Sequence, residues 1–259
     1  MPSRSLASEF PYLDHPGPIA FAHRGGSLEA PENTHVAFEN ARRLGYRYIE
    51  TDAVATRDGI LLAFHDSDLD RLTDGCGRVR DMSFEQVRSA RVAGSEPIPR
   101  LDELLGDWPE MRLNIEPKDD AAIEPLVSAI KRTKAVDRVC IGSFVNARTQ
   151  RMRQLLGPQL CTSPGPLGVA RLRLASFGPP WGAAPAPCLQ VPVRHHGIRI
   201  IDARFLRAAH IRDVRVHVWT VDDEAQMRRL LDLGVDGLMS DRPTLLKAVL
   251  ESRGEWFGL

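Results

Sequence analysis

Two histidines stand at places in the chain where they can take part in proton transfer. His23 ends one apolar run, in the segment AHRGG, and His65 ends another, in AFHD. Imidazole titrates near neutral pH, so one imidazole can take a proton from an attacking oxygen while a second supplies one to a leaving oxygen. Cleavage of a phosphodiester requires this division of work. We therefore predict that His23 and His65 form a catalytic pair.

Three carboxylates occupy similar positions. Glu50 and Asp52 lie two residues apart in a predicted strand, and Glu116 ends a later one. Side chains alternate along a strand, so Glu50 and Asp52 point to the same side. Three acids gathered at one place repel one another unless a counter-charge is present. Oxygen ligands with open positions suit a hard divalent cation, so we expect the three to bind Mg2+, Ca2+ or Mn2+.

Two basic residues accompany the acids. Arg24 follows the first histidine, and Lys118 shares a strand side with Glu116. A planar guanidinium and an ammonium group both bind phosphate oxygens, so these two are candidates for substrate binding. The alternative is that they only form ion pairs with Glu50 and Asp52. The remaining histidines are expected to be structural, although His217 stands apart because it shares a strand side with Trp219.

The elements that must position these residues alternate along the chain. Short apolar, β-branched runs are followed by stretches with helical spacing. The predicted strands are 19–23, 48–55, 60–64, 112–115, 138–142, 159–162, 188–193, 215–221 and 237–240. The predicted helices are 34–44, 83–91, 123–133, 147–156, 203–209, 224–233 and 244–252, with one more short helix inside 163–187. About eight strands separated by helices imply a parallel sheet.

With 259 residues, this α/β sheet is expected to close into a (β/α)8 TIM barrel. The barrel is predicted to be a single domain over 1–259, and an open, doubly wound sheet is the alternative. Residues 67–100 break the alternation with Asp/Gly-rich turns and are predicted to be an insertion of about 30 residues in one barrel loop. In such barrels the reactive groups lie at the carboxyl ends of the strands. Asp241 is expected to cap the final helix.

Composition narrows the range of partners. Lysine plus arginine number 34, and aspartate plus glutamate also number 34, so no long-range attraction to nucleic acid or an anionic membrane is expected. The four cysteines lack metal-ligand or redox spacing and are expected to pack as small apolar residues without disulfides. The first 17 residues form a polar leader without a secretory signal. The apolar stretch LASFGPPWGAAPAPCLQVPV is too rich in proline to span a bilayer.

A cytoplasmic location without stable membrane insertion is expected on these grounds, and the sequence leaves the oligomeric state open.

Seven segments occur in an order that resembles the glycerophosphodiester phosphodiesterase family: AHRGG, APENT, YIETDAVATRDG, AFHD, LNIEPK, VHVWTVDD and GVDGLMSDRP. The resemblance runs from about residue 19 to 245. It implies metal-dependent hydrolysis of small-molecule glycerophosphodiesters to glycerol 3-phosphate and an alcohol, by way of a cyclic phosphate. The residues that match the family's functional positions are His23 and His65 as the acid/base pair, Glu50, Asp52 and Glu116 as metal ligands, and Arg24, Lys118 and Trp219 as substrate-binding residues.

The resemblance also implies that Glu32 and Asn33 shape the first loop and that the 67–100 insertion covers the glycerol end of the substrate. Two positions depart from the family's pattern. Pro117 should end its strand because it removes a ladder donor, and Asp222 stands where many relatives carry Asn.

Three other functions stay open. The same barrel could release a headgroup from lysophospholipids, with the acyl chain against the apolar residues of loop 163–187, which are Phe177, Pro179, Pro180 and Trp181. A non-catalytic barrel that binds phosphate ligands would lack one of the catalytic positions, all of which are present. A sugar-phosphate isomerase barrel needs a Gly-rich phosphate loop after its last strands, and GVDGLMSDRP does not have one.

Overall fold

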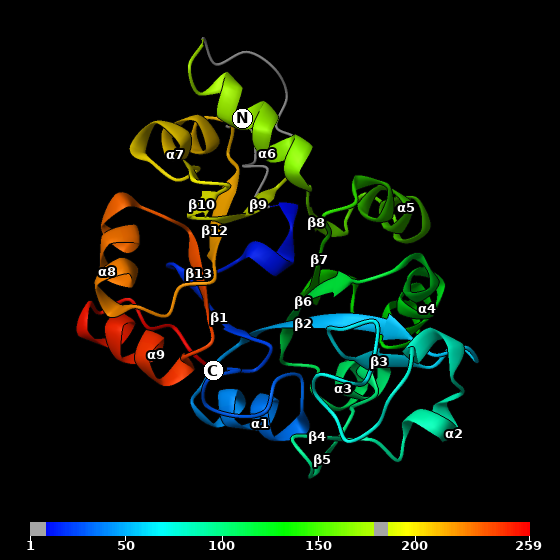
Figure 1. Ribbon diagram of the computed structural model, residues 1–259. Coiled ribbons are helices and arrows are strands. Elements are labelled where there is room, and N and C mark those ends of the chain that lie inside the picture. The colour runs from blue at the N-terminus through cyan, green and yellow to red at the C-terminus, as the bar shows by residue number, and fades with distance from the viewer. Residues whose placement is uncertain (1–8, 179–185) are drawn as a thin grey trace.

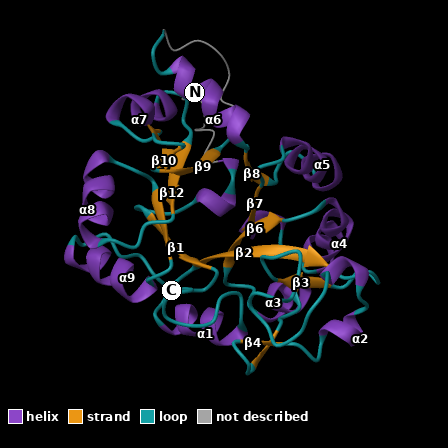
Figure 2. Ribbon diagram, viewed as in Figure 1, coloured by secondary structure: helices purple, strands orange, loops and turns teal. Residues whose placement is uncertain are grey.

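A ring of parallel strands surrounded by helices makes up the protein (Figures 1 and 2). The computed structural model describes residues 9–178 and 186–259. Along the sheet the strands follow the order β8-β7-β6-β2-β1-β13-β12-β9. Their bounds are β1 (Ile19–His23), β2 (Tyr48–Ala55), β6 (Arg112–Pro117), β7 (Val139–Gly142), β8 (Cys161–Ser163), β9 (Cys188–Pro192), β12 (Arg215–Trp219) and β13 (Gly237–Ser240). The predicted (β/α)8 barrel is confirmed.

Each barrel strand is followed by a helix on the outside of the ring. The helices are α1 (His35–Arg43), α3 (Leu101–Asp107), α4 (Ile123–Arg132), α5 (Asn146–Leu156), α6 (Pro166–Ala175), α7 (Ala203–His210), α8 (Glu224–Leu233) and α9 (Pro243–Ser252). Helix α3 is missing from the sequence prediction, although Leu101, Leu104 and Leu105 have helical spacing and are buried. Its seven residues follow a Pro-rich segment, and so short a helix gives a weak periodic signal.

The expected insertion lies between the second barrel strand and α3. Strand β3 (Leu61–Ala63) pairs antiparallel with β2 and leads into it. Its further elements are η3 (Val79–Asp81), α2 (Phe84–Val87), β4 (Arg91–Val92) and β5 (Glu96–Pro97). Buried residues such as Leu69, Val87 and Val92 give the insertion a hydrophobic cluster separate from that of the barrel.

Three short helical turns and a hairpin complete the described elements. They are η2 (Pro11–Leu13), η4 (Asp120–Ala122), η5 (Val136–Arg138), and the antiparallel pair β10 (Arg194–His195) and β11 (Ile198–Arg199).

The leader closes the amino-terminal end of the barrel, which corrects its description as a merely polar segment. Phe10, Tyr12 and Leu13 are each 5% exposed or less and pack in one cluster with strand residues that include Tyr48. The Arg112 guanidinium donates to the carbonyl oxygen of Tyr12 at 3.1 Å and holds the turn in place. The overall composition of the leader does not reveal that it closes the barrel, because its three buried apolar residues lie among polar ones.

The ring is nearly closed. Among the described strands, backbone pairing runs from β8 round to β9, and no ladder joins these two to each other. Side chains bridge this seam instead, since the Gln190 backbone N–H donates to Ser163 Oγ at 3.0 Å.

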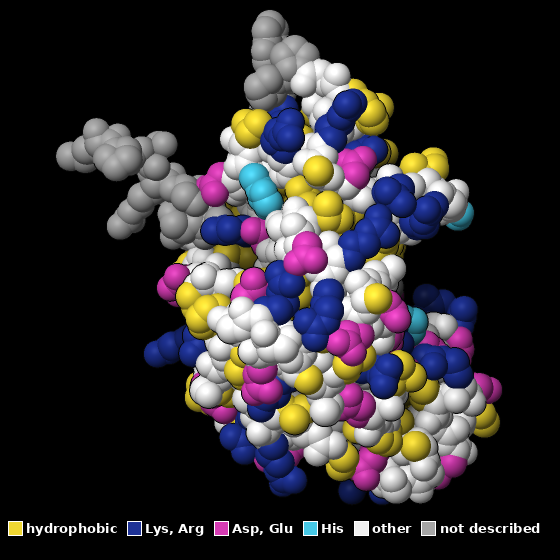
Figure 3. Space-filling model, turned by 90° about the vertical axis from the view of Figure 1, so that its left-hand side faces the viewer, with side chains coloured by type: hydrophobic (Ala, Val, Ile, Leu, Met, Phe, Trp, Pro, Cys, Tyr) yellow, Lys and Arg dark blue, Asp and Glu magenta, His cyan; other side chains and the backbone are white. Residues whose placement is uncertain are grey.

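The distribution of charge on the visible surface agrees with the equal numbers of basic and acidic residues in the sequence. Basic and acidic side chains lie interspersed on the face that carries α7, α8 and α9 (Figure 3). In the described ranges, 9–178 and 186–259, no helix has the length and apolar character that crossing a bilayer requires.

The loop expected to accept an acyl chain is only partly described. Phe177 lies against the guanidinium carbons of Arg173 and Arg204, at 4.9 and 5.1 Å from its ring centroid. Pro179, Pro180 and Trp181 lie outside the described residues.

The barrel plug can be tested with two substitutions at one site. Tyr12→Ala removes a fully buried ring and should lower the free energy of unfolding by about 3 kcal/mol or more. Tyr12→Phe should leave stability unchanged or raise it by about 1 kcal/mol, because the buried hydroxyl has no hydrogen-bond partner. Urea unfolding followed by circular dichroism measures both changes. A Tyr12→Ala variant as stable as the parent would contradict the role of the leader.

Candidate active site

Strand register brings the predicted site residues to one end of the barrel. His23 of β1 is the register partner of Glu50 on β2, and Asp52 is the partner of Glu116 on β6. Because these strands are parallel and adjacent, their carboxyl ends meet on the face where barrel enzymes carry their sites. Strand β6 ends at Pro117, as its missing N–H predicts.

The loop after β1 depends on two glycines. Gly25 and Gly26 have φ of 82° and 106°, in the left-handed region. A Cβ on Gly25 would lie 2.9 Å from the backbone carbon of Ala37, so the loop can approach α1 only without a side chain there. Arg24 also has a positive φ, 51°, which costs a non-glycine residue energy. This conformation turns its side chain back over the strand ends.

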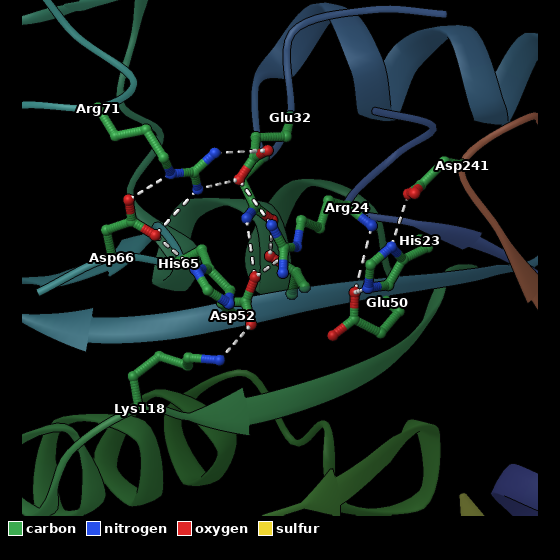
Figure 4. A network of polar contacts seen from close by, with 12 residues as sticks. His23, Arg24, Glu32, Glu50, Asp52, His65, Asp66, Arg71, Lys118 and Asp241 are labelled. Atoms are coloured by element: carbon green, nitrogen blue, oxygen red, sulfur yellow. Dashed lines mark hydrogen bonds and ion pairs between the residues drawn. The ribbon is translucent and has the colours of Figure 1, made fainter. Parts of the chain in front are cut away.

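His23 is held between two carboxylates (Figure 4). Its Nδ1–H donates to Asp241 Oδ1 at 2.6 Å, and its Nε2 lies 3.5 Å from Glu50 Oε2. Burial by itself would lower the pKa of His23, but the negative charges of Glu50 and Asp241 outweigh it and raise the pKa from 6.5 to about 9. His23 is therefore protonated at neutral pH when no metal is bound.

Asp241 does not cap the last helix, which corrects the sequence-based expectation. Helix α9 has Arg242 at its N-cap position, with no side-chain cap. The carboxylate of Asp241 orients His23 instead, and Asp222 accepts the backbone N–H of Asp241 at 2.7 Å. Sequence analysis assigned no chemistry to Asp222, and it now appears as a support for Asp241. The only available signal was that both acids follow the last two barrel strands.

His65 has a carboxylate of its own. Its Nδ1–H donates to Asp66 Oδ1 at 2.5 Å, and Arg71 Nε donates to Asp66 Oδ2 at 2.5 Å. Hydrogen bonding from Arg71 lowers the pKa of Asp66 to about 2 despite partial burial. Arg71 belongs to the insertion and also donates to Glu32 of the first loop, at 3.0 Å. The contribution of Arg71 to the site was not predicted. The sequence of a surface turn does not indicate which acidic residue an arginine in it will bind.

Asp52 is the most strongly paired of the three predicted metal ligands. Lys118 Nζ lies 3.2 Å from Asp52 Oδ1 and 3.1 Å from Glu116 Oε2, so it spans the two acids. Asn33 donates its amide N–H to Asp52 Oδ2 at 3.0 Å. Burial opposes ionisation of Asp52, but Lys118 and then Arg24 overcome this effect and lower its pKa. The ion pairing expected of Arg24 and Lys118 is present at Asp52 and Glu116. In the described part of the chain it does not extend to the Glu50 carboxylate.

Glu50 has no lysine or arginine side chain as an ion-pair partner among residues 9–178 and 186–259. Its carboxylate accepts the backbone N–H of Arg24 at 3.2 Å, and its side chain is only 7% exposed. Burial above all, and then the charges of Asp52 and Glu116, raise the pKa of Glu50 to about 7, although protonated His23 lowers it. A buried acid under such repulsion, next to two further carboxylates, matches the oxygen donors that a hard divalent cation prefers. An ion between Asp52 and Glu116 has to displace the Lys118 ammonium.

The guanidinium of Arg24 lies between two carboxylates, those of Glu32 and Asp52. Its Nη1 donates to Glu32 Oε1 at 2.8 Å. Its Nε lies 3.2 Å from Asp52 Oδ2, yet the N–H is not aligned with that oxygen and has no hydrogen-bond partner. Glu32 and Asp52 thus hold the guanidinium in place, and 18% of the side-chain surface stays exposed for a ligand oxygen.

Trp219 lies apart from the charged network. It ends β12 and meets the ring of Phe144 edge-to-face, with ring centroids 5.9 Å apart. Phe144 follows β7 at the same end of the barrel and is 55% exposed. The sequence analysis did not single out Phe144. All eight predicted site residues thus lie at the carboxyl ends of barrel strands or in the loops after them.

The sequence comparisons with known proteins all indicate the same protein family. The model of the "Glycerophosphoryl diester phosphodiesterase family" matches residues 23–245. A Mycobacterium tuberculosis protein named "Probable glycerophosphodiester phosphodiesterase 2" is 40% identical, covering 95% of this chain and 96% of that protein. A Caldanaerobacter subterraneus protein named "Glycerophosphodiester phosphodiesterase" is 32% identical, covering 91% of this chain and 99% of that protein.

Solved structures agree on the fold. An Oleispira antarctica phosphodiesterase, solved in complex with the product sn-glycerol-3-phosphate, superposes with a TM-score of 0.76 at 24% identity. The match covers 91% of this chain and 97% of that one.

Asp241→Asn tests the electrostatic control of His23. Removing the negative charge while keeping an acceptor should lower the pKa of His23 from about 9, which NMR titration of the chelator-treated protein can follow. Asp236→Asn is the matched control, because Asp236 raises the pKa of His210 instead. An unchanged His23 titration in Asp241→Asn would show that Asp241 has no such influence.

Proposed function

Because the chain belongs to the glycerophosphoryl diester phosphodiesterase family and is an enzyme of that class, we propose that it hydrolyses glycerophosphodiesters to glycerol 3-phosphate and an alcohol. The observation that carries this proposal is the pair of imidazoles, each backed by its own carboxylate, at the barrel end where acids and cations gather. His23 is backed by Asp241, and His65 is backed by Asp66.

The proposed phosphate site uses cations that the network leaves partly free. Arg24 offers the exposed part of its guanidinium, and Lys118 offers a point charge that can move from the carboxylates to a phosphate oxygen. Both are anchored by acids, so they are positioned before the substrate binds and lose little freedom on binding. Trp219, with Phe144 beside it, would line the path to this site.

The proton transfers follow from the hydrogen bonds of the two rings. Each Nδ1–H faces a carboxylate, which leaves Nε2 of each ring as the atom that exchanges a proton with the substrate. One imidazole takes the proton of the attacking oxygen as the new P–O bond forms. The other donates its proton to the departing alcohol oxygen as the old P–O bond breaks, so protons balance. The hydrogen bond from His23 to Asp241, a carboxylate outside the proposed metal ligands, favours the protonated imidazole, so we assign His23 as the donor.

We propose that Glu50, Asp52 and Glu116 hold a divalent cation such as Mg2+, Ca2+ or Mn2+. The support is the burial of Glu50 and the charges of Asp52 and Glu116, which raise the pKa of Glu50, and no lysine or arginine side chain forms an ion pair with it among the described residues. When bound, such an ion supplies positive charge for the phosphate oxygens. The other site residues then need only orient the substrate and move its protons.

A deacylated substrate fits the described surroundings better than a lysophospholipid. The network beside His65 is formed by charged side chains, which suit a polar glycerol group rather than an acyl chain. Phe177, one of the residues expected to receive an acyl chain, is instead stacked with two arginines. The insertion supplies Arg71 to this network, which supports the proposal that it covers the glycerol end.

Hydrolysis of glycerophosphocholine, detected as glycerol 3-phosphate, tests the proposed function. His23→Ala and His65→Ala should each lower kcat by at least about 100-fold, because each removes a proton-transfer group. His210→Ala, at a histidine that pairs with Asp236 elsewhere, should leave kcat unchanged. Full activity in either active-site variant would remove that histidine from the mechanism. Faster turnover of lysophosphatidylcholine would favour the lipid substrate instead.

Metal dependence is a separate prediction. Chelation with EDTA should abolish hydrolysis, and added Mg2+, Ca2+ or Mn2+ should restore it. Glu50→Gln should weaken binding of the restoring ion by at least about 10-fold in calorimetric titration, a loss that even partners outside the first coordination sphere cause. Glu85→Gln, a change on the exposed surface of α2, is the control. Unimpaired binding by Glu50→Gln would exclude Glu50 as a ligand.

A further inference from the structure

Three buried cysteines meet at the opposite end of the barrel from the carboxylates. Cys140 on β7, Cys161 on β8 and Cys188 on β9 come at the beginnings of their strands and are each 1% exposed or less. All three thiols are free, and their Sγ atoms lie within 4.8 Å of one another. Their spacing in the sequence gave no sign of this, because the barrel alone brings 140, 161 and 188 together.

The sulfur spacing matches a metal site. Cys188 Sγ lies 3.7 Å from Cys140 Sγ and 4.0 Å from Cys161 Sγ. A cation with bonds of about 2.3 Å to sulfur places its ligands about 3.8 Å apart in a tetrahedron and about 4.0 Å apart in a trigonal plane. Packed thiols can have similar separations, so spacing alone does not decide between a metal site and apolar packing.

A second observation concerns buried polar groups beside the cysteines. His217 on β12 is fully buried, and neither of its ring nitrogens has a hydrogen-bond partner. His217 is on β12, the strand that pairs with β9, two residues beyond the position opposite Cys188. Unpaired buried nitrogens are costly, so a bound group in this part of the barrel would stabilise the fold.

The position of the cluster in the ring gives a structural reason for a bound ion. Cys161 and Cys188 stand on the two strands that no backbone ladder joins in the described structure. A cation bound to both would link β8 to β9 across the seam, where the Cys188 thiol already lies 3.8 Å from the carbonyl oxygen of Thr162. Phe10, Tyr12 and Leu13 pack over the cluster, so the ion would have to enter while the barrel folds.

We propose that Cys140, Cys161 and Cys188 form a thiolate site for a soft d10 cation, Zn2+ or Cu+. Each thiol releases its proton to solvent as its sulfur binds the ion. Three sulfurs suffice for Cu+, whereas Zn2+ would need a fourth ligand in addition to the three cysteines. The site differs in donor type from the proposed carboxylate site, so the two would select different ions.

Metal analysis of the full-length protein tests the proposal. After purification under reducing conditions and treatment with EDTA, about one Zn2+ or Cu+ per chain should remain and be released only by unfolding in the presence of a thiol reagent. Cys161→Ser should lose this ion. Cys76→Ser, at the exposed cysteine outside the cluster, should retain it.

Refolding with Co2+ makes the test independent of whether a variant folds. The parent protein refolded with this zinc substitute should show a sulfur-to-cobalt charge-transfer band, and so should Cys76→Ser. Parent protein that regains its native circular dichroism after refolding with Zn2+, Cu+ or Co2+, yet holds no EDTA-resistant ion and shows no such band, would overturn the proposal. The cysteines would then be apolar packing. A folded Cys161→Ser that holds as much metal as the parent would overturn it too.

Discussion

Burial of negative charge at the carboxyl ends of β1, β2 and β6 is the constraint around which this end of the protein is organised. Glu50 and Asp52 are almost completely buried, and an ionised carboxylate without a partner is very costly in such a place. Asp52 is compensated by Lys118 and Arg24, while the partners of Glu50 among the described residues are a histidine and a backbone N–H. The two acids are thus compensated unequally, which is the basis for the proposed cation.

Orientation of the two histidines depends on segments far from them in the sequence. Asp241, which holds His23, follows the last barrel strand, 218 residues later. Asp66, which holds His65, is fixed by Arg71 from the insertion, and Arg71 is tied to the first loop through Glu32. Closure of the ring and docking of the insertion therefore both fix the orientation of the two imidazoles. A substitution that disturbs either should alter the site even where it touches neither His23 nor His65.

The two ends of the barrel differ in character: charged side chains gather at the carboxyl end, and apolar packing dominates the amino end. At the carboxyl end, charged side chains lie close together and are balanced against one another. At the amino end, the leader covers an apolar cluster. Such a division is expected of a fold whose strand beginnings serve stability and whose strand ends carry function. The cysteine cluster lies on the stabilising side.

Local patterning was enough to predict the barrel and its candidate site residues, since the alternation of strands and helices and the residues at strand ends are properties of short segments. Predicted strands 19–23, 48–55 and 237–240 coincide with the observed ones. Local pattern did not reveal the leader as a plug, the role of Asp241 toward His23, the part played by Arg71, or the meeting of Cys140, Cys161 and Cys188. Each of these is a contact between segments distant in the chain, and only closure of the ring determines which side chains face one another.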